Sequence, residues 1–290
     1  MKRIFAGFAA VVLVFGLLAA CGGDEGRERI YIPLAAEELQ HPFWQIVYAG
    51  AQAAAEAYEV DISFIEPAGG AQAGLFEKVS NNLAAAAIGA DSMFTAIREE
   101  IAGAAPESPV YIVILVQDLA SISATERARG FAERMLELAA GANGSAAILG
   151  SLPAINTGEA NAAVRIKVAA GMPDMANAAR DILNTAGLIG VFCPNEAAAE
   201  GLLAAIHAGA ALPEGVILVG FGAGSAQKEA VRSGLMMGAV TQDPFQIGYQ
   251  AVSMAVRAAR GEVVLDVDTG ARWWTASNMD DPVIAGLLYD

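Results

Sequence analysis

The chain has 290 residues, of which 55% are hydrophobic and 17% are charged, and its formal net charge at pH 7 is −15. This length is enough for one large α/β domain or for two domains of ordinary size. The excess of acidic residues argues against nucleic acid as a partner, because nucleic-acid binding depends on Lys and Arg side chains that neutralise phosphates.

The N-terminus has the pattern of an export signal. Lys2 and Arg3 precede an apolar run over Ile4–Leu18, which is too short for a comfortable membrane span. The run closes on Leu18-Ala19-Ala20-Cys21, which resembles the lipobox of bacterial lipoproteins. The resemblance implies that residues 1–20 are removed and that Cys21 is lipidated, which would anchor the exported chain to the bacterial cell envelope. An ordinary signal peptide with an incidental Cys21, or an uncleaved anchor, is the alternative.

After a tether over residues 21–29, short β-rich runs alternate with longer Ala-rich helical stretches. The expected strands are continuous apolar runs: Ile30–Leu34, Val60–Ile65, Val110–Val116, Ala146–Leu149, Leu188–Phe192, Val216–Phe221 and Gly238–Thr241. The expected helices include Phe43–Tyr58, Arg129–Ala140, Ala176–Asn184, Ala197–His207 and Phe245–Arg260. Strands without polar alternation are buried on both faces, so the pattern predicts a doubly wound α/β fold with parallel sheets.

Several short motifs follow one another along these predicted strands and helices. They are His41-Pro42-Phe43-Trp44, Gly190 to Glu196, Val219 to Gly222, Val240 to Tyr249, Asp268-Thr269-Gly270 and Asn278 to Pro282. Together they resemble the type I periplasmic binding proteins, the ribose-like sugar-binding family of ABC importers, over most of residues 29–282. The resemblance implies two parallel-sheet lobes joined by a hinge, with the ligand between them and no enzymatic activity. The first lobe would comprise residues 29–124 plus 244–262, and the second residues 125–243 plus 263–290.

Aromatic residues stand at the first turn of the first predicted helix. Phe43 and Trp44 follow the end of the first strand, where open α/β sheets bind ligands. An aromatic ring covers the apolar C–H face of a sugar. Phe43 is equally consistent with core packing beside Ile46 and Val47, whereas Trp44 lies off that stripe and is the better candidate for ligand contact.

Polar candidates lie at the ends of the predicted strands. Amides and carboxylates there would pair with sugar hydroxyls as donors and acceptors. Asn195 is a helix cap, a hydroxyl ligand or both, and Gln242 is a ligand contact or an ordinary turn residue. The expected polar set is His41, Asp118, Asn195, Glu196 and Gln242.

The chain departs from the family pattern after the strand Val216–Phe221. The family usually has Gly-Phe-Asp where this chain has Gly220-Phe221-Gly222, and that Asp contacts sugar hydroxyls. A sugar that needs the lost acceptor would bind more weakly by about 1.5–3 kcal/mol. The segments around Ala90–Glu100 and Ala162–Val168 also look shorter than the family pattern.

Enzymatic chemistry has little support in the sequence. Gly220 to Gly224 imitates a dinucleotide-binding fingerprint, but Ser225 stands where the third glycine belongs. Cys193 ends an apolar run, so we expect a buried thiol rather than a nucleophile. His41 and His207 have no partner at zinc-ligand spacing, so we expect no metal and no cofactor.

The sequence therefore predicts a monomeric solute-binding lipoprotein that captures a small sugar or polyol and delivers it to an ABC permease in the membrane. A ligand sensor that presents its closed form to a membrane receptor is the alternative, and an exported α/β enzyme is a third.

Overall fold

The structure is a computed structural model that describes residues 29–35, 40–65, 79–152, 155–157, 161–171 and 173–289. The predicted signal peptide, the lipidation site Cys21 and nearly all of the tether lie outside these residues. The strands are β1 (Tyr31–Ala35), β2 (Asp61–Ile65), β3 (Val110–Val116), β4 (Ala146–Leu152), β5 (Ile155–Thr157), β6 (Val164–Ala170), β7 (Leu188–Phe192), β8 (Ile217–Phe221), β9 (Gly238–Gln242) and β10 (Ala271–Trp274). The helices are α1 (Pro42–Tyr58), α2 (Asn82–Gly103), α3 (Ile122–Asn143), α4 (Met175–Leu183), α5 (Glu196–His207), α6 (Ser225–Arg232), α7 (Pro244–Ala259) and α8 (Pro282–Ala285).

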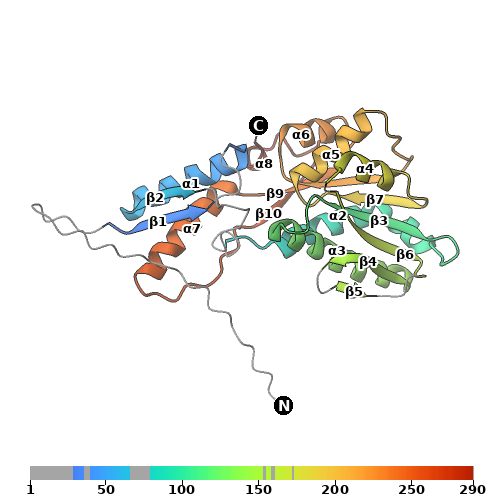
Figure 1. The fold of residues 1–290 in the computed structure, drawn as a ribbon, viewed down its shortest axis with the longest axis horizontal. Helices are drawn as coiled ribbons and strands as arrows, with labels where there is room; N and C mark the ends of the chain where they lie inside the picture. Colours follow the sequence, from blue (N-terminus) through green and yellow to red (C-terminus); the bar gives the residue numbers. More distant parts are fainter. Residues whose placement is uncertain are drawn as a thin grey trace, which may run out of the picture.

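The strands form two separate sheets, which divide the described chain into a small unit and a large unit (Figure 1). The small unit comprises residues 29–65 and 244–270 and contains β1 and β2, which pair in parallel. Ile32 and Leu34 of β1 are buried against α1 and α7, whereas Tyr31 is exposed on the other face of the sheet. Only one face of this two-stranded sheet therefore contributes to the core.

Two glycines allow α1 and α7 to pack backbone against backbone. A Cβ atom on Gly50 would overlap the carbonyl oxygen of Phe245, and one on Gly248 would overlap the carbonyl oxygen of Val47. Glycine is therefore required at both positions for the helices to keep their separation. This contact holds α7, which follows the large unit in the chain, onto the N-terminal helix.

The large unit, the described residues from 82 to 243 and from 271 to 289, contains an eight-stranded sheet in the order β10-β9-β8-β7-β3-β6-β4-β5. All its pairs are parallel except β9–β10 and β4–β5. Alternate residues of β3 face opposite layers: Ile112 and Ile114 pack with α2 and α3, and Val113 and Leu115 pack with α4 and α5. Helices cover both faces, which explains why the strands read as continuous apolar runs.

Sheet membership differs from the predicted lobe boundary at residue 124. Strand β3 pairs with β6 and β7, and α2 packs along α3, so residues 82–116 belong to the large unit. The segment 90–100, which looked shortened, lies within the continuous helix α2. The predicted boundary rests on the resemblance to the family, and the apolar runs identify a buried strand without showing which sheet it joins.

The close contact of α1 and α7 gives a stability prediction. Gly248→Ala should lower the free energy of unfolding by about 1–3 kcal/mol or more, because the added methyl meets backbone that cannot rotate away. Gly141→Ala is the matched control: it lies in α3 with open space around it and should stabilise the protein by about 0.5–1 kcal/mol. Chemical denaturation measures both changes. Equal stabilities of the two variants would contradict the packing account.

Candidate ligand-binding site

The carboxyl ends of β3, β7, β8 and β9 lie at one edge of the large sheet. The chain leaves β3 through α3 toward β4 on one side of the sheet, and it enters β7 on the other side through α4. The point between β3 and β7 is therefore the topological switch point, where open α/β sheets form their ligand-binding crevice.

Amide side chains occupy this switch point. Asn195 follows β7 and Gln117 follows β3, and Asn195 Nδ2 donates a hydrogen bond of 2.9 Å to Gln117 Oε1. Asn195 Oδ1 also accepts from the Ala198 amide at 3.0 Å and so caps α5. The predicted capping role of Asn195 is confirmed, and the same side chain lies at the crevice.

Arg127 connects four parts of the large unit. From α3, its guanidinium donates to Gln242 Oε1 at 2.9 Å, to Asn82 Oδ1 at 3.0 Å and to the Pro194 carbonyl at 3.3 Å. The guanidinium also lies 3.9 Å from the ring centroid of Phe221, as a cation–π contact. Gln242 is only 4% exposed, so its carbonyl oxygen depends on this donor.

A carboxylate, a phenol and an imidazole meet where the two units touch. The Tyr289 hydroxyl donates to Glu196 Oε2 at 3.0 Å and accepts from the Ala223 amide at 3.3 Å. His41 Nε2 of the small unit lies 3.4 Å from the same Glu196 oxygen. His41 Nδ1 accepts a hydrogen bond from the Phe43 amide as the cap of α1, which leaves Nε2 facing Glu196.

Phe43 contributes to both hydrophobic cores. It packs with the apolar cluster of the small unit and with the cluster beneath α5 of the large unit. Its ring makes edge-to-face contacts with Trp44 at 5.5 Å and with Tyr289 at 6.0 Å between centroids. Trp44 packs against the small-unit cluster. Phe43 is therefore a packing residue between the units, in agreement with the packing alternative that its spacing allowed.

Gly222, where the family pattern has Asp, lies under two side chains of the large unit. Its φ is +127°, and a Cβ atom there would lie 2.8 Å from Gln227 Nε2 and 3.5 Å from Glu196 Cβ. A side chain at 222 would be strained and crowded. In this chain, the carboxylate nearest to that place belongs to Glu196, which starts α5.

Asp118 is the remaining member of the predicted polar set, and three residues of the site were not in that set. The Asp118 carboxylate is exposed and accepts from the Ala120 amide at 2.8 Å, within its own turn. Gln117, Arg127 and Tyr289 were not predicted. Gln117 ends a strand run, so the rule that selected Gln242 could have found it, but no sequence signal marks Arg127 on a helix or Tyr289 near the C-terminus.

The thiol of Cys193 is not a candidate nucleophile. Burial raises the pKa of the Cys193 thiol to about 12, so it stays protonated and unreactive. Within the described part of the chain, no three His, Cys, Asp or Glu side chains are grouped closely enough to hold a metal ion. Among the helices that the structure describes, none combines the length and apolar composition needed to cross a membrane.

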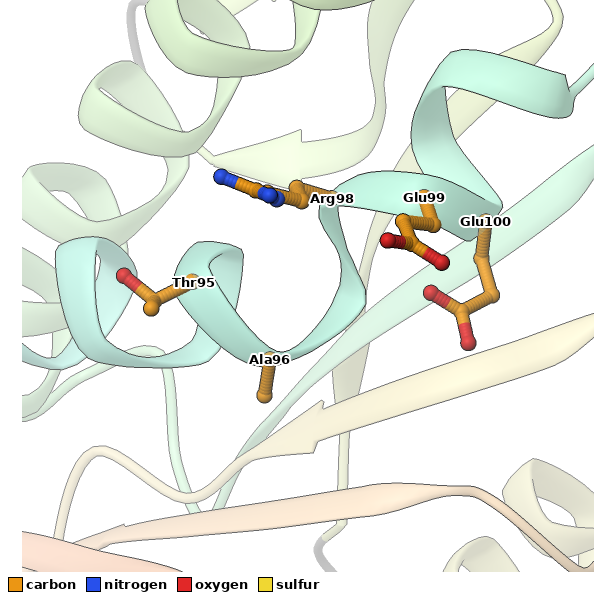
Figure 2. Close-up of a pocket in the computed structure, with 5 residues that line it drawn as sticks. All are labelled: Thr95, Ala96, Arg98, Glu99 and Glu100. Atoms are coloured by element: carbon orange, nitrogen blue, oxygen red, sulfur yellow. The ribbon is translucent and has the colours of Figure 1, made fainter.

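A surface concavity of about 450 Å³ lies along the C-terminal half of α2 (Figure 2). It is lined by Thr95, Ala96, Arg98, Glu99 and Glu100. Asn82, which contacts Arg127, begins the same helix, so the concavity starts about 20 Å away at 1.5 Å per residue. It is separate from the polar network at the strand ends.

Comparison with known proteins identifies the family. The periplasmic binding protein domain matches residues 79–262, which is more than half of the chain. The chain belongs to this family. Its members form a class of binding proteins rather than enzymes, and the α/β fold with parallel sheets is the type I fold that the sequence predicted. Among functionally curated proteins, none matches this chain.

Solved structures of similar proteins support the assignment. A Brachyspira murdochii protein, described as an ABC transporter and LacI family transcriptional regulator, is 30% identical over 90% of this chain and 98% of its own, with a TM-score of 0.71. A carbohydrate transporter solute-binding protein from Agrobacterium radiobacter, in complex with D-arabinose, is 22% identical over 91% and 100% of the chains, with a TM-score of 0.65. The XylFII–LytSN complex matches at 15% identity over 87% and 99%, with a TM-score of 0.62.

The contacts of Arg127 in this binding protein give a second prediction. Arg127→Ala leaves the Gln242 carbonyl oxygen buried without its donor and uncovers the Phe221 ring, so the free energy of unfolding should fall by about 2–3 kcal/mol. Arg129→Ala, on an exposed pair with Glu133 in the same helix, should change it by less than about 0.5 kcal/mol. Urea denaturation of both variants checks this. A loss at Arg127 no larger than at Arg129 would contradict the role given to the guanidinium.

Proposed function

We propose that this protein is the solute-binding component of an ABC transporter and that it captures a small sugar or polyol between its two units. The observation that carries the proposal is the set of amide and guanidinium groups at the switch point of the large sheet, beside the aromatic first turn of α1. The D-arabinose complex of the Agrobacterium radiobacter relative supports a carbohydrate as the ligand class.

The side chains at this site suit a molecule with hydroxyl groups. Asn195 and Gln117 satisfy each other through one hydrogen bond, and a sugar hydroxyl that both donates and accepts can replace each partner. Gln242 is buried and its side-chain oxygen accepts from Arg127, so its amide would already be oriented before the ligand binds. Trp44, with Phe43 behind it, would cover an apolar C–H face of the ring. His41, Asp118 and Glu196 complete the proposed contacts.

Delivery requires a change of shape and a location at the membrane. Hinge closure around the ligand would create the surface that docks on the permease. We propose that residues 1–20 direct export and that acyl chains on Cys21 hold the protein at the membrane, because two or more chains give stable attachment where one does not. The bound partners would be the sugar, the permease and the lipid surface, with the protein acting as a monomer.

A sensor role is the second candidate function. The structural match to the XylFII–LytSN complex favours it, because a protein of this fold is there in complex with a partner. The binding crevice would be the same and only the docking partner would differ. Co-purification with a permease supports transport, and co-purification with a receptor histidine kinase supports sensing.

Ligand binding should raise the melting temperature. In a panel of pentoses, hexoses, polyols and amino acids, a ligand at a thousand times its dissociation constant stabilises the protein by about 4 kcal/mol. For a chain of this size the expected shift is on the order of 10 °C. Differential scanning calorimetry of the chain from Gly22 onward, which keeps every described residue, measures it. A transition that no sugar or polyol moves would contradict the proposed ligand class.

The aromatic contact gives a separate prediction. Trp44→Ala should weaken binding of the best sugar in that panel about tenfold or more, because the ring face that covers the ligand is lost. Gln45→Ala, at the exposed neighbouring position of α1, should leave the affinity unchanged. Isothermal titration calorimetry compares them. Equal dissociation constants for the Trp44 variant and the parent would remove Trp44 from the site.

A further inference from the structure

The C-terminal segment Leu287–Tyr289 is anchored in the large unit. Ile284 of α8 and Tyr289 are each 8% exposed and pack in the cluster that contains α5 and Trp274. The Leu287 carbonyl accepts from Thr241 Oγ1, at the end of β9, at 3.4 Å. The segment therefore follows the carboxyl edge of the sheet and ends beside the loop after β8.

Tyr289 connects groups of both units. Its hydroxyl makes two hydrogen bonds within the large unit, one donated to Glu196 and one accepted from the Ala223 amide. Its ring contacts two residues of the small unit, with centroid distances of 6.0 Å to His41 and 6.0 Å to Phe43. Burial and the adjacent Glu196 carboxylate raise the pKa of Tyr289 above its usual value, so the hydroxyl stays a donor.

We propose that Tyr289 is a positioning residue of the binding site and that it sets how far the two units close. The inference rests on the proposed function, since it concerns closure around the same site. Tyr289 holds the Glu196 carboxylate where His41 meets it, and its ring forms the surface on which Phe43 rests. The effect on the small unit is thus exerted partly through Glu196.

The contacts divide into two groups that respond differently to opening. The bonds of Tyr289 to Glu196 and to Ala223 join residues of the large unit, so they persist when the units separate. The contacts of His41 with Glu196 and of Phe43 with Tyr289 join the two units, so opening breaks them. Tyr289 therefore keeps the Glu196 carboxylate and its own ring in place on the large unit, where His41 and Phe43 meet them at each closure.

The test measures closure directly in the absence of added sugar. Single-molecule FRET between dyes on Ala57→Cys in α1 and Ala140→Cys in α3 reports the separation of the units, and both positions are exposed. The chain from Gly22 onward lacks Cys21, and Cys193 is buried, so no native cysteine is labelled. Tyr289→Phe keeps the ring and removes the hydroxyl, and it should lower the ratio of closed to open molecules about tenfold. Val283→Ala, on the exposed side of α8, should leave the ratio at the parent value.

A double-mutant cycle separates positioning from simple destabilisation. Glu196→Gln removes the carboxylate that meets His41 and should lower the ratio at least as much as Tyr289→Phe does. The double variant should lower it no further than Glu196→Gln alone, because the hydroxyl acts on His41 through that carboxylate. A Tyr289→Phe ratio equal to that of the parent, or fully additive effects in the double variant, would overturn the proposal. Because no sugar is present, these outcomes do not depend on the sugar panel. A parent protein that binds no sugar would contradict the proposed function, whereas the role of Tyr289 is tested by the FRET ratios alone.

Discussion

The structure of the site depends on the guanidinium of Arg127. Its hydrogen bonds and its contact with Phe221 tie together the end of β9, the loop after β7 and the start of α2. Gln242, which it fixes, is followed directly by Asp243, the cap of α7, where the chain passes into the small unit. One half-buried cation thus holds the end of β9 in place next to the point where the chain passes into the small unit.

In the proposed site, the two units would contribute different groups to the ligand. The large unit supplies preorganised polar groups from the ends of parallel strands, where the switch point brings distant segments together. In the described part of the small unit, β1 and β2 form the sheet, and the capped first turn of α1 carries His41, Phe43 and Trp44. Glycine contacts between α1 and α7 pack that helix closely onto the rest of the small unit, so in the proposed closure the turn would approach Glu196 and Tyr289 together with the whole unit.

The sequence predicted the elements better than their assembly. The strands β1, β2, β3, β4, β7, β8 and β9 and the cap Asn195 followed from apolar runs and local capping chemistry. Strand β6 was not predicted because Arg165 and Lys167 interrupt its apolar residues. Of the residues predicted at strand ends, Asn195 and Gln242 make hydrogen bonds to other segments of the large unit, whereas Asp118 bonds within its own turn. Arg127 and Tyr289 act through contacts 115 and 93 residues apart in the chain, which no local pattern encodes.

We propose that sugar hydroxyls bind at the switch point and replace the hydrogen bond between the side-chain amides of Asn195 and Gln117. Side-chain amide resonances of ¹⁵N-labelled protein, followed during titration with the panel sugar that raises the melting temperature most, test this residue by residue. The account predicts saturable shifts of the Gln117, Asn195 and Gln242 side-chain amides, with Gln52 on the exposed face of α1 unchanged. Saturation of binding with all three amides unmoved would show that the ligand sits elsewhere.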